Sequence, residues 1–335
     1  MSVPGAGDPP SAQWARAGER GSKFALRFLL LCVRTVGHAP LVVVLAPIAV
    51  YFVLFSRAAR DSSKDFLRRI RRARGEGGEP GLRDVYRHIY GFAAAILDRF
   101  ALWGGAFDEF EINLHGREAM EPLIEHRTGA VLVGAHIGSF DVLRVIAREA
   151  DIPVNVIMYS VNAERINAAF KELDPESRVR IIDLDPNSTK AAFEVRKCIE
   201  RGEFVAVLAD RVLPRARSRV AHAMFLGQRA AFPQGPFVLA SVLRVPVILT
   251  IALRTGAWTY DAYLERISPG DGIGRRNRGN EIQRQVELYA ARLEHYCLMA
   301  PEQWFNFYDF WADPGDRPHA GVDALLVESD DDSST

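Results

Sequence analysis

Apolar and polar residues alternate along much of the chain in short blocks that predict repeated strands and helices. Four apolar runs rich in β-branched residues, "AVLVGAH", "VNVIMYS", "RVRIIDL" and "FVAVLAD", have the length of buried strands. Segments with helical spacing lie between them, including one around residues 162–173 and "TKAAFEVRKCIERG". This alternation predicts an α/β fold with a mainly parallel sheet flanked by helices on both faces.

Further elements are predicted on both sides of this alternation. Upstream, residues 83–103 have helical apolar spacing, "FEINLHG" is typical of a strand and "REAMEPLIEH" of a short helix. Downstream, helices are expected at about 236–243 and 280–299, and "VPVILTIAL" is expected to be a buried strand. We expect "YDAYLERI" to add an antiparallel edge strand.

A long apolar stretch, "APLVVVLAPIAVYFVLF", covers residues 39–55 without a charge. As a helix it would be roughly 26 Å long, just short of a hydrocarbon core, and we expect it to be an N-terminal membrane helix. Eight basic residues follow between Arg57 and Arg74. They predict the cytoplasmic side of the inner membrane and attraction to anionic headgroups. The alternative is a buried core helix with Pro40 in its first turn and Pro47 as a kink.

Composition changes along the chain and divides it into four regions. We expect a disordered N-terminus (1–18), a membrane-associated helical segment with a basic flank (19–74), an α/β domain (82–312) and an acidic disordered tail (313–335). The sequence "GEGGEPG" at 75–81 is typical of a linker.

Several functional classes find no support in the sequence. Basic and acidic residues both number 42, and the basic run contains no interleaved aromatic residues, so nucleic-acid binding is not indicated. The three cysteines have no CxxC spacing, so no metal site or disulfide framework is expected. Nucleotide-binding glycine motifs, GxSxG and HExxH are absent.

The stretch "GAHIGSFD" places two titratable residues, His136 and Asp141, directly after a predicted strand. In open α/β sheets, ligands bind at the carboxyl ends of the strands. Asp141 could accept a hydrogen bond from one ring nitrogen while the other removes a proton from a hydroxyl. The alternative is a helix N-terminal aspartate beside an unrelated loop histidine. The strand "FVAVLADR" brings Asp210 and Arg211 to the same edge.

The ordered motifs "GAHIGSFD", "VLADR", "FLGQRAAFPQGPF" and "YAARLEHYCLMAPEQWFNFYDFW" resemble the bacterial lipid A biosynthesis (lauroyl/myristoyl) acyltransferase family of the lysophospholipid acyltransferase superfamily. The resemblance extends over about residues 14–311 and implies a glycerolipid acyltransferase-like fold. It implies His136 as general base, Asp141 as its orienting partner and Asp210 in the active site. An arginine between the two acids completes the family's site, and Arg178 and Arg180 are both candidates. Arg211, Gly227 and Gly235 are candidate substrate-binding residues.

The resemblance also implies the reaction and its participants. An acyl thioester of acyl carrier protein or coenzyme A would be the donor, a lipid or glycolipid hydroxyl the acceptor, and no further cofactor is expected. Two departures leave the acceptor open: Asp141 stands where lipid A members usually have Glu, and "ADR" replaces the more common "DQ" or "DHD" ending. An aryl-polyene-type lipid acceptor, a thioesterase and a non-catalytic lipid-binding protein remain alternatives.

Overall fold

Seven strands form one mainly parallel sheet, which confirms the predicted fold class. The computed structural model describes residues 38–103, 105–158, 178–183, 190–212, 219–270 and 277–312. The strand order is β1-β9-β8-β2-β5-β3-β4, and β8 and β9 form the antiparallel pair of the sheet. The bounds of the strands are β1 Glu111–His115, β2 Ala130–Gly134, β3 Val154–Met158, β4 Val179–Asp183, β5 Phe204–Leu208, β8 Val247–Arg254 and β9 Thr259–Ser268.

The strand predicted at "YDAYLERI" is antiparallel to its neighbour, as expected, but it does not lie at the edge of the sheet. Strand β9 pairs with β8 on one side and in parallel with β1 on the other, where Glu111 lies opposite Thr259. Alternate residues of β9 are buried, whereas no residue of β1 is fully buried. The more polar β1 is therefore the strand that suits the edge.

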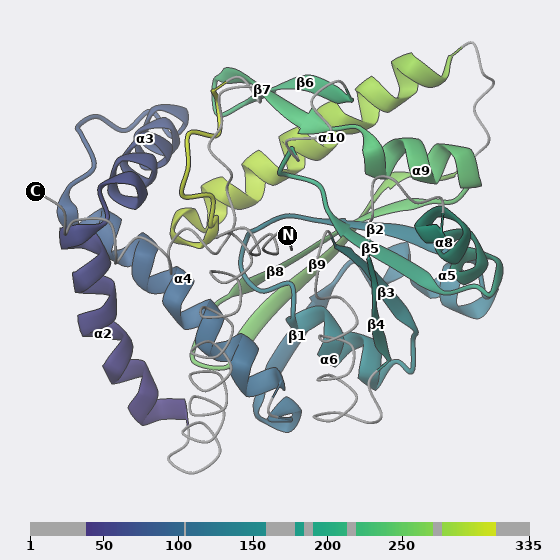
Figure 1. Ribbon diagram of the computed structural model, residues 1–335, viewed down its shortest axis with the longest axis horizontal. Coiled ribbons are helices and arrows are strands. Elements are labelled where there is room, and N and C mark those ends of the chain that lie inside the picture. The colour runs from purple at the N-terminus through teal and green to yellow at the C-terminus, as the bar shows by residue number, and fades with distance from the viewer. Residues whose placement is uncertain are drawn as a thin grey trace, which may run out of the picture.

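Helices cover both faces of the sheet, because successive side chains of each strand point to opposite sides. On one face Val131 and Val133 join the largest apolar core, together with residues of α9 (Gly235–Leu243) and α10 (Arg278–Met299). On the other face Leu132 packs with the region of α5 (Glu121–Glu125) and α6 (Val142–Glu149). Helix α8 (Lys190–Glu200) packs against the β3, β4 and β5 end of the sheet (Figure 1). The helix expected around 162–173 lies outside the described residues.

A separate two-stranded hairpin of β6 (Val220–Phe225) and β7 (Gln228–Pro233) lies alongside α10 (Figure 1). Its turn residues Leu226 and Gly227 both have positive φ angles, 48° and 78°. Two such residues define the type I′ turn, which matches the twist of a hairpin and favours glycine. In the described parts of the chain, short 3-10 helices also lie at Phe107–Glu109, Arg117–Ala119 and Pro301–Gln303.

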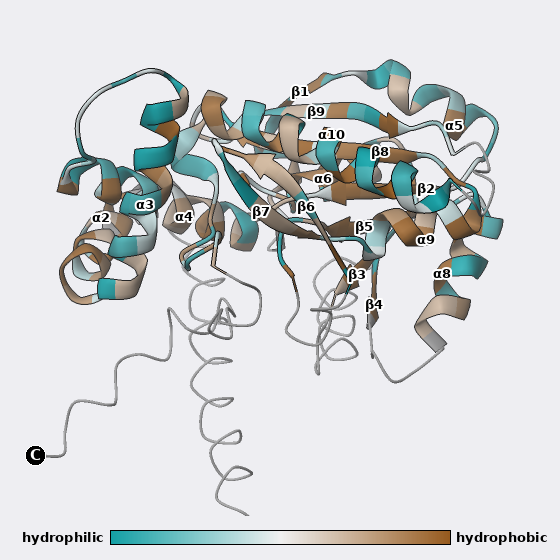
Figure 2. Ribbon diagram, turned by 90° about the horizontal axis from the view of Figure 1, so that it is seen from above, coloured by the Kyte–Doolittle hydropathy of each residue, from teal (hydrophilic) through white to brown (hydrophobic). Residues whose placement is uncertain are grey.

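The apolar stretch after residue 38 folds as helix α2 (His38–Phe55) and lies against α4 (Leu82–Trp103). Ala49 and Val53 of α2 are buried against Val85 and Ile89 of α4. Large apolar side chains on its other side are exposed, and α2 is largely brown in Figure 2. No helix within the described parts of the chain is long and apolar enough to cross a membrane, so the expected membrane-spanning helix is not supported.

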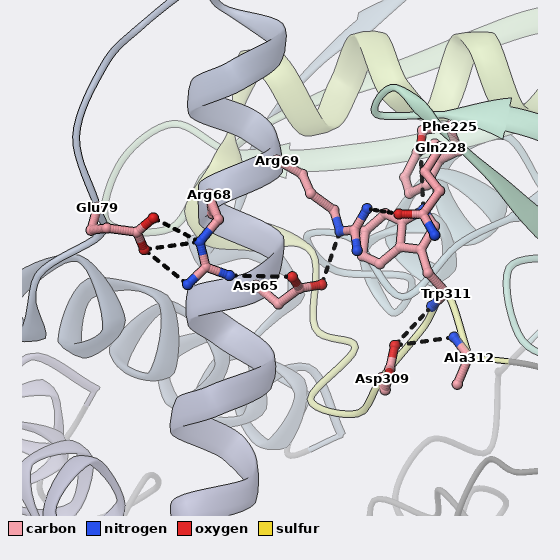
Figure 3. A network of polar contacts seen from close by, with 9 residues as sticks. All are labelled: Asp65, Arg68, Arg69, Glu79, Phe225, Gln228, Asp309, Trp311 and Ala312. Atoms are coloured by element: carbon pink, nitrogen blue, oxygen red, sulfur yellow. Dashed lines mark hydrogen bonds and ion pairs between the residues drawn. The ribbon is translucent and has the colours of Figure 1, made fainter.

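Several arginines of helix α3 (Arg57–Ala73) form ion pairs and hydrogen bonds with other parts of the chain (Figure 3). Arg68 pairs with Glu79 at 2.8 Å, and Arg71 pairs with Asp84 at 2.8 Å. Arg69 binds Gln228 of the hairpin and lies 3.9 Å from the ring centre of Trp311. These arginines therefore fasten α3 to the neighbouring loop, to the hairpin and to the C-terminal segment.

Candidate active site

The loop after β2 carries His136 across the carboxyl edge of the sheet. Its backbone is held by the segment that follows α10: the amide of Phe305 donates to the carbonyl of His136 at 2.7 Å, and the amide of Gly138 donates to the carbonyl of Gln303 at 2.8 Å. Ile137 also forms an isolated antiparallel bridge with Trp304. His136 is thus fixed by backbone contacts from a distant part of the chain.

Gly138 is required by the geometry of this loop. Its φ angle is +60°, and a Cβ atom at this position would overlap the carbonyl of Ala252 at the end of β8. The next amide, that of Ser139, donates to the same carbonyl at 2.9 Å. Only glycine combines this backbone conformation with so close an approach, which explains the glycine in "HIGSFD".

Asp210 is the partner of the His136 ring. The two atoms His136 Nδ1 and Asp210 Oδ1 are 2.7 Å apart, and the His136 amide donates to Asp210 Oδ2 at 3.0 Å. The sheet register explains the pairing: Gly134 of β2 lies opposite Leu208 of β5, and each side chain of the pair comes two residues further on. Both residues therefore leave adjacent parallel strands at the same level.

Two further side chains hold the Asp210 carboxylate, which is fully buried. Asn306 Nδ2 donates to Oδ2 at 2.8 Å, and Trp304 Nε1 donates to the same oxygen at 3.3 Å. Burial alone would raise the pKa of Asp210, but attraction to His136, the hydrogen bond with its ring, the charge of Arg211 and the hydrogen bond from Asn306 lower it well below its usual range. Asp210 therefore stays ionised.

An ionised carboxylate only accepts hydrogen bonds, so the proton of the neutral imidazole sits on Nδ1 and the lone pair on Nε2. Burial lowers the pKa of His136 more than the Asp210 carboxylate raises it. At neutral pH the ring is therefore uncharged and able to accept a proton. About a quarter of the side chain, 24%, remains exposed, which leaves access for a substrate.

Arg211 extends the same group of contacts. Its Nε donates to Asn306 Oδ1 at 2.6 Å and its Nη2 donates to the carbonyl of Phe305 at 2.8 Å. Its positive charge lowers the pKa of His136, after burial and against the effect of Asp210. Arg211 thus lies at the edge of the site, where it fixes the side-chain amide of Asn306 that donates to Asp210.

Asp141 has a different contact from the one expected, which corrects the predicted His136–Asp141 pair. Its Oδ2 accepts a hydrogen bond from Arg99 Nε of α4 at 2.6 Å. The physical reason is that Nδ1 of His136 has a single hydrogen to donate, and Asp210, which follows the neighbouring strand, accepts it. Asp141 is also the N-cap residue of α6, but its side chain makes no capping hydrogen bond.

A family comparison identifies the class of protein to which the chain belongs. The family model described as bacterial lipid A biosynthesis acyltransferase matches residues 92–312. The chain belongs to this acyltransferase family. The matched region contains His136, Asp141, Asp210 and the C-terminal segment that surrounds them. No curated protein matches the chain.

Two arginines expected in the acyltransferase site lie elsewhere in the described structure. The carbonyl of Arg178 accepts from the amide of Val154, at the beginning of β3 and β4, and its guanidinium pairs with Asp151 at 2.5 Å. Arg180 is exposed on β4. Strand β4 is outermost, and β3 and β5 separate it from β2. Neither arginine therefore lies on a strand adjacent to β2.

The two candidate glycines have distinct positions. Gly227 forms the hairpin turn between β6 and β7, where its positive φ angle explains the residue. Gly235 begins α9, and a Cβ added there would meet no atom within 4 Å. Since α9 leads back to the start of β8, its first residues lie toward the carboxyl edge of the sheet. The open space beside Gly235 could therefore hold part of a ligand.

A cavity of about 190 Å³ lies beside the His136 loop. Helix α4, the end of β8, the β8–β9 turn and the C-terminal segment form its walls. The lining residues are Gly91, Ala95, Gly138, Arg254, Thr255, Gly256, Tyr260, Glu302, Gln303 and Phe305. Among the described residues no group of three or more His, Cys, Asp or Glu side chains could hold a metal ion.

Sequence reasoning did not identify Arg99, Trp304 or Asn306 as site residues. Arg99 lies in a helical pattern that resembles any amphipathic helix. Trp304 and Asn306 lie in "QWFNFYDFW", a segment dominated by aromatic residues, which are typical of core packing. The polar asparagine, fully enclosed among aromatics, was the available signal, because a buried amide requires a polar partner.

Proposed function

We propose that this acyltransferase moves a fatty acyl chain from an acyl thioester, carried by acyl carrier protein or coenzyme A, to a hydroxyl of a lipid or glycolipid of the lipid A type or a related one. His136 is the general base and Asp210 its orienting partner. The observation that carries the proposal is the 2.7 Å contact between His136 Nδ1 and Asp210 Oδ1, which leaves Nε2 to accept a proton.

The reaction follows from that protonation state. His136 Nε2 removes the proton of the acceptor hydroxyl as its oxygen attacks the thioester carbonyl carbon. The carbon–sulfur bond then breaks, the new ester remains on the acceptor, and the thiolate takes the proton from the imidazolium. A thiolate is a good leaving group, so no covalent acyl-enzyme is needed. Asp210 stabilises the positive charge that appears on the ring between these two steps.

The test compares the lipids of cells that contain wild-type protein with those of cells that contain His136→Ala, by mass spectrometry. We expect one lipid species to lose the mass of one fatty acyl group in the variant. His126→Ala is the matched control, because His126 is an exposed histidine outside the site. An unchanged lipid profile with folded His136→Ala protein would contradict the proposal.

An assay with purified protein separates the alternatives by the product that forms. If purified wild-type protein frees fatty acid from the thioester without any acceptor, the enzyme is a thioesterase in which His136 activates water. If neither reaction occurs and lipids still bind, the protein is a lipid-binding protein. The mass of the product also distinguishes a lipid A-type acceptor from an aryl-polyene-type lipid.

We further propose that the enzyme is attached to the cytoplasmic face of the inner membrane through helix α2. Val43, Leu54 and Phe55 of this helix are more than half exposed, although they are strongly apolar. The double variant Leu54→Glu, Phe55→Glu should lose most of its flotation with vesicles of phosphatidylethanolamine and phosphatidylglycerol. Leu288→Glu, at an exposed leucine of α10, should float like wild type. Equal flotation of both variants would remove α2 as the anchor.

A further inference from the structure

Arg99 and Asp141 form an ion pair beside His136 that the mechanism above does not use. Arg99 Nε and Asp141 Oδ2 are 2.6 Å apart. The Arg99 side chain is 37% exposed and that of Asp141 is 12% exposed. The guanidinium charge also lowers the pKa of His136. Asp141 follows His136 by five residues along the chain, and the partly exposed guanidinium of Arg99 is accessible to a substrate.

The two ordinary tasks of Asp141 are carried out by other groups or left undone. As N-cap residue of α6 it could accept a backbone amide of that helix, but its side chain makes no such bond. As the aspartate of the HxxxxD motif it could orient the imidazole through Nδ1, but Asp210 already does so at 2.7 Å. In the structure Asp141 pairs with the guanidinium of Arg99.

Helix α4 gives that guanidinium a defined position. The residue before it, Asp98, is fully buried and accepts hydrogen bonds from Tyr260 Oη at 2.6 Å and from Arg254 Nε at 3.0 Å. These contacts join α4 to the end of β8 and to β9. The backbone at Arg99 is therefore fixed relative to the His136 loop, as a preorganised charge requires.

The face of α4 that carries Arg99 also lines the cavity beside the His136 loop. Gly91 and Ala95 are lining residues, and Arg99 follows Ala95 by four positions, so all three share one helix face. Gly138 of the His136 loop also lines this cavity of about 190 Å³. The cavity therefore lies between the helix that carries Arg99 and the loop that carries His136.

From this arrangement we propose that Arg99, held by Asp141, binds the carbonyl oxygen of the acyl thioester and stabilises the negative charge that develops on it during acyl transfer. Asp141 is then a positioning residue for Arg99, and Asp210 is the positioning residue for His136. The inference rests on the proposed function. As the hydroxyl oxygen forms its bond to the carbonyl carbon, the carbonyl electron pair moves to oxygen, and it returns when the carbon–sulfur bond breaks.

The other arginine whose charge reaches His136 is less suited to this task. Arg211 uses Nε for Asn306 and Nη2 for the carbonyl of Phe305. Arg99 is anchored through Nε, on one side of its planar group, and the terminal nitrogens of a guanidinium can bind a second oxygen. A single oxyanion donor typically contributes about 10²–10³-fold to kcat.

The experiment compares Arg99→Gln, Arg99→Lys and Asp141→Asn with wild type in acyl transfer from an acyl thioester. Arg99→Gln should lower kcat about 100-fold and leave the KM for donor and acceptor within about twofold. Arg99→Lys should recover part of the loss, and Asp141→Asn should lower kcat about tenfold. Arg87→Gln, at an exposed arginine of the same helix, is the matched control and should behave like wild type.

Two measurements do not depend on turnover. Dodecylphosphonate, which carries a tetrahedral anion on a fatty chain, should bind wild type and lose about tenfold in affinity in Arg99→Gln, measured by calorimetry. In the same variant the NMR titration of His136 should move to higher pH, because a positive charge has been removed.

The outcomes separate the two proposals. Wild-type protein that turns over no thioester contradicts the proposed function, whereas an active wild type with an unaffected Arg99→Gln overturns only the assignment of Arg99. A rise in acceptor KM with unchanged kcat would also overturn it, because Arg99 would then bind an anionic group of the acceptor. Loss of phosphonate binding together with the loss of kcat supports it.

Discussion

His88 Nε2 lies 2.7 Å from the carbonyl oxygen of Trp304, and its Nδ1 lies 2.9 Å from the Ser63 hydroxyl. A carbonyl only accepts, so Nε2 carries the proton and Nδ1 accepts from Ser63. The side chain is fully buried, and it joins α3 and α4 to the residue whose indole contacts Asp210. A neutral histidine thus links the N-terminal helices to the site.

This link predicts acid sensitivity. Burial lowers the pKa of His88 from 6.5 to about 4, partly offset by the hydrogen bond to Trp304. The pKa of His88 is lower in the folded than in the unfolded state. The contribution of neutral His88 to the free energy of unfolding is therefore fully present above pH 6.5 and decreases as the pH drops toward 4. The loss should approach about 3 kcal/mol, at about 1.4 kcal/mol per pKa unit. Urea unfolding at several pH values measures it. His88→Gln should unfold with a weaker dependence on pH in this window, and an unchanged dependence would contradict the assignment.

Asp210→Asn should abolish most acyl transfer without unfolding the protein. The amide can donate toward Nδ1 and so favour the tautomer with its proton on Nε2, which cannot act as a base. We expect kcat to fall by roughly 10³-fold or more. Asp151→Asn, at an exposed carboxylate paired with Arg178, is the control and should keep wild-type kcat. Circular dichroism of both variants verifies folding, and substantial residual activity in folded Asp210→Asn would argue against the tautomer role.

The pH dependence of the reaction should report on His136. Its pKa is lowered, chiefly by burial, so kcat/KM should rise with pH through a value below 6.5 and level off above it. Arg211→Gln removes a positive charge that lowers this pKa, and its acid limb should move to higher pH. Initial rates between pH 4.5 and 8 give both profiles. An acid limb centred above 6.5 in wild type would rule out His136 as the titrating base.

Gly138→Ala should be far more harmful than the same change at Gly235. At Gly138 the φ angle is +60° and the new methyl group would overlap the Ala252 carbonyl, so the His136 loop must move. A loss of about 1–3 kcal/mol in stability and a severe loss of activity are expected. Gly235→Ala meets no atom within 4 Å at the start of α9 and should change stability little. Thermal unfolding and the acyl-transfer assay of both variants test this prediction, and equal losses in the two variants would contradict it.

The fold was largely predictable because its strands are buried on both faces. Runs such as "AVLVG" and "FVAVL" have no other reading once helical segments alternate with them. The position of β9 inside the sheet was not predicted, because the sequence does not reveal that β9 pairs with the more polar β1, which then forms the edge. The β6–β7 hairpin was not predicted, since its strands are short and mixed in polarity.

The site was predictable only in part, and the reason is distance along the chain. His136 and Asp210 each follow a strand, so topology brings them to one edge. Which acid would meet the imidazole depended on β2 and β5 being neighbours, a fact that local spacing cannot give. Arg99 comes from a helix before the sheet, and Asn306 lies 96 residues after Asp210. Their roles arise from packing, where no short motif signals them.

The backbone bridge between the His136 loop and the segment after α10 has a consequence for biosynthesis. Phe305, Trp304 and Asn306 must all be in place before His136 and Asp210 are held in register. A ribosome adds about 5–20 residues per second, so several seconds pass between the synthesis of Asp210 and that of residues 304–306. During this interval the strands of the sheet can pair, but His136 and Asp210 are not yet held together. The nascent polypeptide is therefore catalytically inactive until its synthesis has passed residue 306. Cleavage of the mature chain before Trp304 would inactivate the enzyme in the same way.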